Sequence, residues 1–143
     1  MSNRQLSGMS GVYYVAAELS KLGYIALVTT RNTKAADIIA MNDKTGVSVA
    51  IEVKTCGIST SDSFWLLSAR DRQKKPHNFI YVFVKLNRDK AHDFYIVPAQ
   101  FVAKNVEKQK AKTGSIWYYI SKDRIASFKQ KWDLIQYVTT RKS

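Results

Sequence analysis

The spacing of apolar positions along the chain changes several times, and each change predicts a new element. Between residues 11 and 22 the apolar residues recur at helical intervals, and Gly23 follows as a stop signal, so an amphipathic helix is expected there. Residues 24–30 and 36–41 are short aliphatic and β-branched runs, which are typical of strands. Residues 1–9 lie outside these patterns and are expected to be flexible.

The clearest strand signal covers residues 47–55, where apolar and polar side chains alternate. Successive side chains of a strand point to opposite faces of a sheet, so Glu52 and Lys54 share the face opposite to the apolar set. The polar segment 42–46 before this strand predicts a hairpin turn. With that turn, antiparallel pairing places Asp37 directly opposite Glu52.

The second half of the chain predicts further elements around the same sheet. A continuous apolar run at residues 80–84 is typical of a strand covered on both faces. The order of elements indicates a single α/β domain over residues 1–143, with a mixed sheet flanked by helices. The other expected elements are strands at 64–67, 94–97 and 116–120, a helix from Pro98 to about Lys112, and a last helix, capped by Ser121, with Ile125, Phe128 and Trp132 on one face.

The chain is strongly basic, and its charge is unevenly distributed. Its 143 residues include 23 Lys+Arg and 11 Asp+Glu, a formal net charge of +12. Residues 1–64 hold 6 Lys/Arg and 5 Asp/Glu, whereas residues 65–143 hold 17 and 6. A concentrated basic excess is typical of proteins that bind polyanions, nucleic acid above all, although a basic surface that only aids solubility has the same composition.

The remaining composition excludes several classes of protein. The single cysteine, Cys56, can form neither an internal disulfide nor a cysteine-rich zinc site, and His77 and His92 lack ligand spacing. No apolar run reaches the roughly 18 residues of a membrane span, and no secretory signal is expected at the polar N-terminus. We therefore expect an intracellular, cytoplasmic domain.

Carboxylates are the candidate chemical groups of this basic chain. If Asp37 and Glu52 lie opposite each other, their Cβ atoms are about 4.5–5.5 Å apart, and the two charges repel unless a cation compensates. Mg²⁺ prefers such oxygen ligands, and Lys54 could then position or polarise water or a phosphate. The alternative is an exposed ion pair of Glu52 and Lys54, with Asp37 ending a strand at the surface.

Glu18 is a third candidate acid. In the expected first helix it lies at the edge of the buried stripe, about 40° from Leu22 and about 60° from Val15. A helix packed on the sheet could bring the Glu18 carboxylate beside the other two acids. Alternatively, Glu18 is a surface residue paired with Lys21.

These residues resemble a known superfamily. A helix with a glutamate, a strand, Ala36-Asp37, a hairpin and Ile51-Glu52-Val53-Lys54 are together similar to the PD-(D/E)xK nucleases, which have the restriction-endonuclease-like fold. The segment from Val15 to Tyr24 looks like the opening helix of archaeal Holliday-junction resolvases and small homing-type members. The resemblance covers residues 11–56, and Ala36 stands where the motif name has proline.

The resemblance carries implications for fold, chemistry and assembly. It implies the core order α-β-β-β-α-β, Mg²⁺-dependent hydrolysis of DNA phosphodiesters, with Mn²⁺ able to substitute, and often a homodimer. Residue by residue, Asp37, Glu52 and Glu18 correspond to metal ligands. Lys54 corresponds to the charged catalytic partner.

Two basic segments are candidate contacts to a phosphate backbone, and either can instead be a solvated surface. Aromatic residues 117–119 are candidates for stacking on bases or for packing in a core or interface. The basic candidates are Arg70, Arg72, Lys74 and Lys75, followed by Lys104, Lys108 and Lys112, which recur every four residues along the expected helix.

The sequence as a whole predicts a Mg²⁺-dependent DNA endonuclease. One alternative is a nucleic-acid-binding module that keeps the nuclease fold without hydrolysis. Another is a protein-interaction domain that does not bind nucleic acid.

Overall fold

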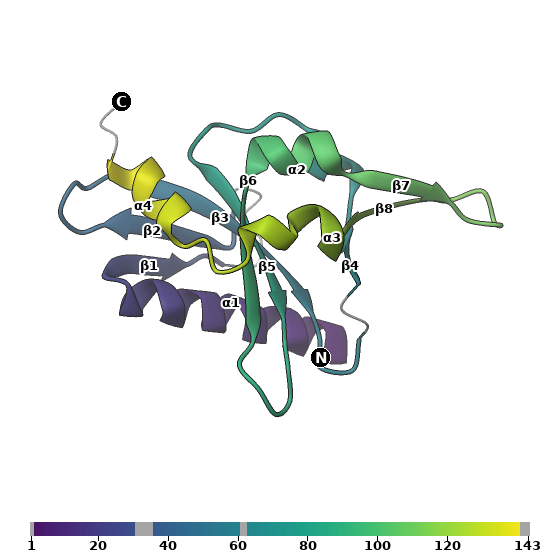
Figure 1. Ribbon diagram of the computed structural model, residues 1–143, viewed down its shortest axis with the longest axis horizontal. Coiled ribbons are helices and arrows are strands. Elements are labelled where there is room, and N and C mark those ends of the chain that lie inside the picture. Colours follow the sequence, from purple (N-terminus) through teal and green to yellow (C-terminus); the bar gives the residue numbers. More distant parts are fainter. Residues whose placement is uncertain (1, 31–35, 61–62, 141–143) are drawn as a thin grey trace.

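The protein has two sheets, which form a mixed α/β structure (Figure 1). The computed structural model describes residues 2–30, 36–60 and 63–140. The strands are β1 (Tyr24–Val28), β2 (Ile38–Asn42), β3 (Ser48–Cys56), β4 (Phe64–Leu67), β5 (Phe79–Lys85), β6 (Asp93–Pro98), β7 (Glu107–Lys110) and β8 (Ile116–Ser121). The helices are α1 (Asn3–Lys21), α2 (Ala99–Asn105), α3 (Lys122–Ile125) and α4 (Asp133–Thr140), with 3₁₀ turns η1 (Ala69–Arg72) and η2 (Ala126–Phe128).

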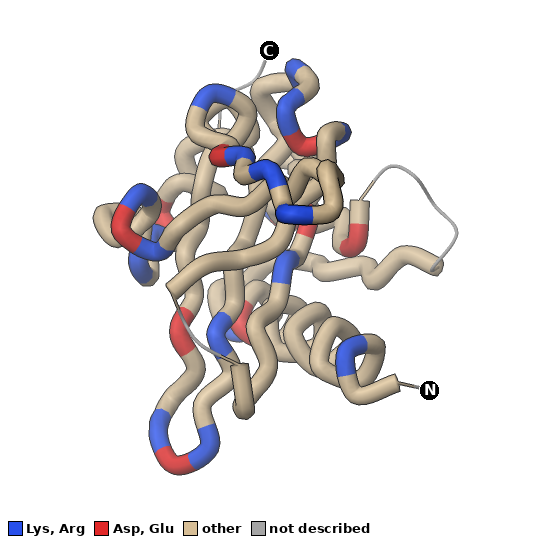
Figure 2. Tube along the Cα trace, turned by 90° about the vertical axis from the view of Figure 1, so that its right-hand side faces the viewer, with Lys and Arg blue, Asp and Glu red and all other residues tan. Residues whose placement is uncertain are grey.

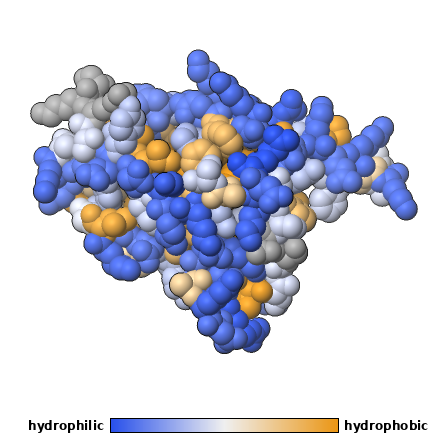
Figure 3. Space-filling view, in the orientation of Figure 1, coloured by the Kyte–Doolittle hydropathy of each residue, from blue (hydrophilic) through white to orange (hydrophobic). Residues whose placement is uncertain are grey.

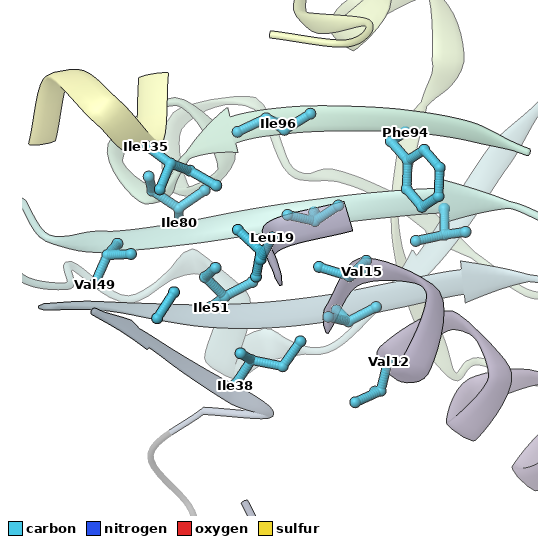
Figure 4. Close-up of a cluster of buried hydrophobic side chains, with 14 of the residues drawn as sticks. Val12, Val15, Leu19, Ile38, Val49, Ile51, Ile80, Phe94, Ile96 and Ile135 are labelled. Carbon is cyan, nitrogen blue, oxygen red and sulfur yellow. The ribbon is translucent and has the colours of Figure 1, made fainter. Parts of the chain in front are cut away.

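The central sheet has the strand order β1-β2-β3-β5-β6 and separates two apolar layers. On one face, Val15 and Leu19 of α1 and Ile135 of α4 join a cluster with alternate residues of the strands (Figure 4). On the other face, Trp65 of β4 and Val102 of α2 belong to a second cluster. The alternation expected along β3 is therefore confirmed, and helices flank the mixed sheet as expected.

The strand register is the one that the sequence predicts. Strands β2 and β3 are antiparallel with Ile38 opposite Ile51, and the N–H of Asp37 donates to the carbonyl of Ile51 at 2.9 Å. Strand β3 then runs parallel to β5. The crossover between these parallel strands contains β4 and η1, where the resemblance implied an α-helix.

Helix α1 begins earlier than its apolar pattern predicts. Ser2 and Gln5 form a reciprocal capping box: the Gln5 N–H donates to Ser2 Oγ at 3.2 Å, and the Ser2 N–H donates to Gln5 Oε1 at 2.9 Å. Residues 3–9, expected to be flexible, are therefore the first turns of the helix. The helix start is set by hydrogen bonds between two polar residues, so the pattern of apolar residues does not reveal it.

Gly11 allows α1 to lie close to β3. A β-carbon at this position would collide with Thr55 Oγ1, so only glycine fits without movement of Thr55. Within the part of the chain that the structure describes, Thr55 Oγ1 is buried and neither accepts nor donates a hydrogen bond. The close approach of helix and strand is thus achieved at the cost of one unsatisfied hydroxyl.

The prediction of a helix from Pro98 to Lys112 is wrong beyond Asn105, where α2 ends. The Asn105 side-chain amide donates to the Phe101 carbonyl at 2.8 Å, and Val106 then adopts extended backbone angles. The following residues form β7, which pairs with β8. Pairing with the aromatic strand β8 therefore stabilises an extended conformation in these residues instead of the expected helix.

The prediction of a single last helix is also wrong, because the residues after β8 form three separate helical segments, α3, η2 and α4. Gln130 has a positive φ of 57°, which ends the helical path between η2 and α4. Phe128 packs on Phe101 with ring centroids 4.8 Å apart, whereas Trp132 packs on Phe94 in the opposite apolar layer. Phe128 and Trp132 therefore pack on opposite faces of the central sheet. None of the helices in the described ranges is long and apolar enough to cross a membrane.

Candidate active site

Asp37 directly precedes β2, and Glu52 lies in the neighbouring strand β3, with its side chain on the sheet face opposite to α1. The Val53 N–H donates to Asp37 Oδ2 at 2.8 Å, while the main chain of Asp37 is bonded to Ile51. These two bonds anchor Asp37 next to Glu52, as the continued register requires. The strand pairing alone thus places two carboxylates side by side.

Lys54 follows Glu52 on the same face of β3. Its Nζ lies 3.5 Å from Glu52 Oε1 and 3.7 Å from Asp71 Oδ2. The Arg70 guanidinium approaches from η1, with Nη2 4.0 Å from Glu52 Oε1. The candidate site therefore alternates acidic and basic groups.

Asp71 is the member of this cluster that sequence reasoning missed. It is only 2% exposed, and its carboxylate accepts hydrogen bonds from the Tyr81 hydroxyl at 2.6 Å and the Ser68 N–H at 2.8 Å. Tyr81 is the neighbour of Glu52 in the parallel register of β3 and β5. Two signals could have found Asp71: it is the only acid in the basic segment 70–75, and it lies three residues after a serine, as in a capping box.

The carboxylates of Glu52 and Asp71 have pKa values shifted in opposite directions. Burial raises the pKa of Glu52, and the charge of Asp37 raises it further against the opposing effect of Lys54. Burial also raises the pKa of Asp71, but the charge of Lys54 and the hydrogen bond from Tyr81 have the larger combined effect, so the pKa is lowered. Asp71 is therefore held as an anion, whereas the negative charge at Glu52 is incompletely compensated.

Burial and the hydrogen bond to Asp71 raise the pKa of Tyr81, so this side chain remains a neutral hydroxyl donor at all relevant pH values. The Tyr81 ring also stacks on Phe83, with centroids 5.7 Å apart. Tyr81 thus links the charged cluster to the aromatic layer beneath it.

The donor set of the site fits a hard divalent cation. Mg²⁺ is usually held by one or two carboxylates together with waters and substrate oxygens, and Asp37 and Glu52 supply such a pair. Among the residues that the structure describes, no three His, Cys, Asp or Glu side chains converge on one metal position. Two carboxylates of this kind would leave most of the coordination shell of an ion to water and substrate.

Glu18 is not brought to this pair. Its Oε1 lies 3.4 Å from Lys21 Nζ, and α1 packs on the sheet face opposite to Glu52. The charges that shift the pKa of Glu52 come from four other residues, and Glu18 is not one of them. The structure thus shows the Glu18–Lys21 pair that the sequence left open as the alternative.

The first basic segment lies beside the site, and the second is dispersed. Arg70 and Arg72 are in η1, and Lys75 donates to the Arg70 carbonyl at 3.2 Å while its Nζ lies over the Tyr81 ring. Lys74, between these basic residues, is exposed. The expected single face of Lys104, Lys108 and Lys112 does not exist, because these residues lie in α2, in β7 and in the turn after β7. Basic positions are spread over loops and elements of the trace (Figure 2).

Comparison with solved structures identifies the fold. Hjc, a Holliday junction resolvase of the archaeal hyperthermophile Archaeoglobus fulgidus, matches with a TM-score of 0.52 and 19% identity over 84% of this chain and 88% of that chain. The bacterial homing endonuclease I-Ssp6803I matches with a TM-score of 0.63 and 17% identity over 98% and 96%. The chain has the restriction-endonuclease-like fold. The fold expected from the motif resemblance is therefore confirmed.

Comparison of the sequence with known proteins finds no match, in contrast to comparison of the structure. No family model matches the chain, and no curated protein sequence matches it significantly. The protein thus shares its fold with both structural neighbours although fewer than one residue in five is identical to either of them.

Proposed function

We propose that this protein is a metal-dependent endonuclease that hydrolyses DNA phosphodiester bonds at Asp37, Glu52 and Lys54. The observation that carries the proposal is the position of Asp37, which precedes β2 and is bonded to Ile51 and Val53 on either side of Glu52, with Lys54 two residues beyond Glu52. The two structural neighbours, a Holliday junction resolvase and a homing endonuclease, support DNA as the substrate class.

In this mechanism Asp37 and Glu52 hold Mg²⁺, or Mn²⁺ in its place. When bound, such an ion lowers the pKa of a coordinated water and neutralises charge on a phosphate. Glu52 favours a cation because burial and Asp37 raise its pKa, so its anionic form lacks full compensation. Glu18, which corresponds to a metal ligand in the resemblance, lies on α1 across the sheet from this pair, so it becomes a third ligand only if α1 also moves toward the pair.

Lys54 positions the attacking water or the scissile phosphate through its ammonium group. Its Nζ lies between Glu52 and Asp71, within 4 Å of a carboxylate oxygen on each. Asp71 is a positioning residue in this scheme, because it acts through Lys54. A charge fixed in place before the reaction avoids reorganisation when negative charge develops on the phosphate.

The basic surface beside the site holds the DNA backbone in this proposal. Arg70 and Lys74 extend from the same segment as Asp71, so a phosphate chain bound there passes close to the carboxylates. Cleavage of both strands of a duplex needs two sites, which favours a homodimer. Edge strand β1 offers an apolar surface for it, with Ile25 40% and Leu27 60% exposed.

The decisive experiment incubates the purified protein with plasmid, linear duplex and four-way-junction DNA in Mg²⁺, in Mn²⁺ and in EDTA. Metal-dependent cleavage is expected, and Asp37→Asn and Lys54→Met should each reduce its rate by more than about 100-fold. Cleavage that persists in both variants would refute the assignment of these residues. Salt-sensitive DNA binding without cleavage of any substrate would instead identify an inactive binding module.

A further inference from the structure

The three-stranded sheet β4-β8-β7 extends from the body of the protein and presents two chemically different faces (Figure 1). Trp65 and its partner Ile120 are buried in the core cluster. Their neighbours along each strand point the other way, because successive side chains of a strand alternate between faces. Leu66 of β4 lies opposite Tyr119 of β8 on this outer face.

The outer face is an exposed aromatic surface. Trp117 is 53% exposed and Phe64 is 41% exposed, and the Phe64 and Tyr119 rings meet edge to face at 5.9 Å. These side chains surround a hollow of about 350 Å³, whose remaining lining includes Gln109 and Lys110. The hollow thus combines flat apolar walls with one amide group and one ammonium group at its rim.

The surroundings of this hollow are positively charged. Lys110 lines the hollow, whereas Lys108 lies opposite the inner-face residue Tyr118 and Lys112 lies in the turn after β7. The nearby acid, Glu107, is neutralised by Arg124, whose Nε lies 3.2 Å from its carboxylate. The surface of the projecting hairpin is accordingly mostly hydrophilic, with small hydrophobic areas (Figure 3).

We propose that this aromatic face binds unpaired nucleobases of the DNA substrate. Proteins that hold single strands combine aromatic rings, on which bases stack, with cations that follow the phosphates. Trp117 and Tyr119 supply the rings, Gln109 supplies an amide for base edges, and Lys110 supplies the cation. A second copy of the chain is a poorer occupant, because it would bring the lysines of two hairpins together in mutual repulsion.

The inner face of the same sheet connects the proposed base-binding face to the proposed active site. The Arg72 guanidinium lies 5.7 Å from the centroid of the Tyr118 ring, and the preceding residue, Asp71, contacts Lys54. The proposed base-binding face and η1 thus lie on opposite sides of the same small sheet, and the backbone adjoining the bound bases passes the edge of this sheet to reach η1. This rests on the proposed nuclease function and specifies its substrate class: DNA with unpaired bases next to a duplex.

The experiment measures binding in EDTA, so that no cleavage occurs. Fluorescein-labelled dT20 and a 20-bp duplex are titrated against the wild type, Trp117→Ala and Trp117→Phe by fluorescence anisotropy. Trp117→Ala should raise the Kd for dT20 by roughly 10-fold and change that for the duplex less than twofold, while Trp117→Phe keeps most of the affinity because it retains a ring. Tyr13→Ala, which removes a similarly exposed ring from α1, is the matched control and should bind both DNAs as the wild type does.

Equal dT20 affinity of Trp117→Ala and the wild type would overturn the proposal. A change in molecular mass by light scattering, with dT20 affinity unaltered, would assign the face to self-association instead. Circular dichroism verifies that each variant is folded. Binding without metal is independent of hydrolysis, so loss of dT20 binding in Trp117→Ala would stand even if the protein cleaved no substrate.

Discussion

The side-chain ammonium of Lys54 lies 3.7 Å from the carboxylate of Asp71, a buried residue of the crossover between β3 and β5. Asp71 is itself fixed by Tyr81 and Ser68, which donate hydrogen bonds to its two oxygens. A lysine has four rotatable side-chain bonds, so a buried anion with fixed coordinates limits where its charge can lie. This relationship places the ammonium beside Glu52.

Replacement of Asp71 by asparagine should therefore impair catalysis more than binding. The asparagine side chain would keep hydrogen-bonding atoms but lose the charge that holds Lys54, so we expect kcat to fall roughly 10- to 100-fold with KM almost unchanged. Steady-state cleavage of a labelled duplex measures both constants. Asp89→Asn, an exposed carboxylate in the β5–β6 loop, is the matched control. A rise in KM as large as the fall in kcat for Asp71→Asn would assign Asp71 to DNA binding.

Glu52→Gln should stabilise the metal-free protein at neutral pH. Burial and the charge of Asp37 raise the pKa of Glu52 on folding, so the folded protein favours the protonated form. A group of this kind contributes stability at low pH that is lost as the pH rises through its folded-state pKa. We expect Glu52→Gln to gain about 1 kcal/mol at pH 7.5 in EDTA, or roughly 2–4 °C in Tm, and to lose this advantage as the pH falls.

Glu107→Gln is the control, because the pKa of Glu107 is shifted in the opposite direction and the change in stability should have the opposite sign. Burial acts to raise the pKa of Glu107, but hydrogen bonds from Ser121 and Arg124 outweigh it and lower the pKa. Its contribution to stability is present above the unfolded-state pKa and is lost as the pH falls through the folded-state value. Glu107→Gln should thus be less stable than the wild type at pH 7.5, and thermal melts that show Glu52→Gln also to be less stable would contradict the assigned environment.

Glu18→Gln tests whether the helix acid joins the site. If Glu18 leaves Lys21 to become a third ligand, its replacement should raise the Mg²⁺ concentration for half-maximal cleavage roughly 10-fold. Lys21→Gln, which removes the resting partner at 3.4 Å, should leave that concentration the same or lower it. Cleavage assays across a Mg²⁺ series give the answer, and an unchanged Mg²⁺ dependence of Glu18→Gln would leave Glu18 as a surface ion pair.

The contact between Gly11 and Thr55 predicts two stability changes of opposite sign. Gly11→Ala should destabilise the protein by about 1–3 kcal/mol, because its methyl group collides with Thr55 Oγ1. Thr55→Val should stabilise it by roughly 1 kcal/mol, because it removes a buried hydroxyl without a hydrogen bond. Urea unfolding measures both. In the Thr55→Ala background the penalty of Gly11→Ala should shrink, and fully additive effects would show that the contact does not exist.

Lys74→Gln should reduce both DNA affinity and its dependence on salt. Each phosphate contact contributes about −0.9 to the slope of log affinity against log salt, so loss of one contact should lower the slope by about that amount. Lys90→Gln, an exposed charge in the β5–β6 loop, should leave the slope unaltered. Binding isotherms between about 50 and 300 mM KCl, over which the Debye length more than halves, distinguish the two. Identical slopes would remove Lys74 from the DNA surface.

The sequence by itself determined the local part of the site. The alternation of β3 and the turn before it were sufficient to place Asp37 opposite Glu52, with Lys54 on the same face. Strand periodicity and hairpin register depend on residues close together in sequence, so a short window contains the information. The PD-(D/E)xK pattern lies inside that window, and it indicated the fold correctly.

Only the tertiary structure decided what surrounds that pair. Asp71 reaches Lys54 through a parallel crossover, and parallel pairing has no short turn from which a register can be inferred. Pro98 predicted the start of a helix that reaches about Lys112, but pairing with β8 made residues 107–110 a strand, since cross-strand packing of aromatic side chains outweighs a weak intrinsic preference. Long-range packing therefore fixed the buried anion, the separation of Glu18 from the pair, and the exposed face around Trp117.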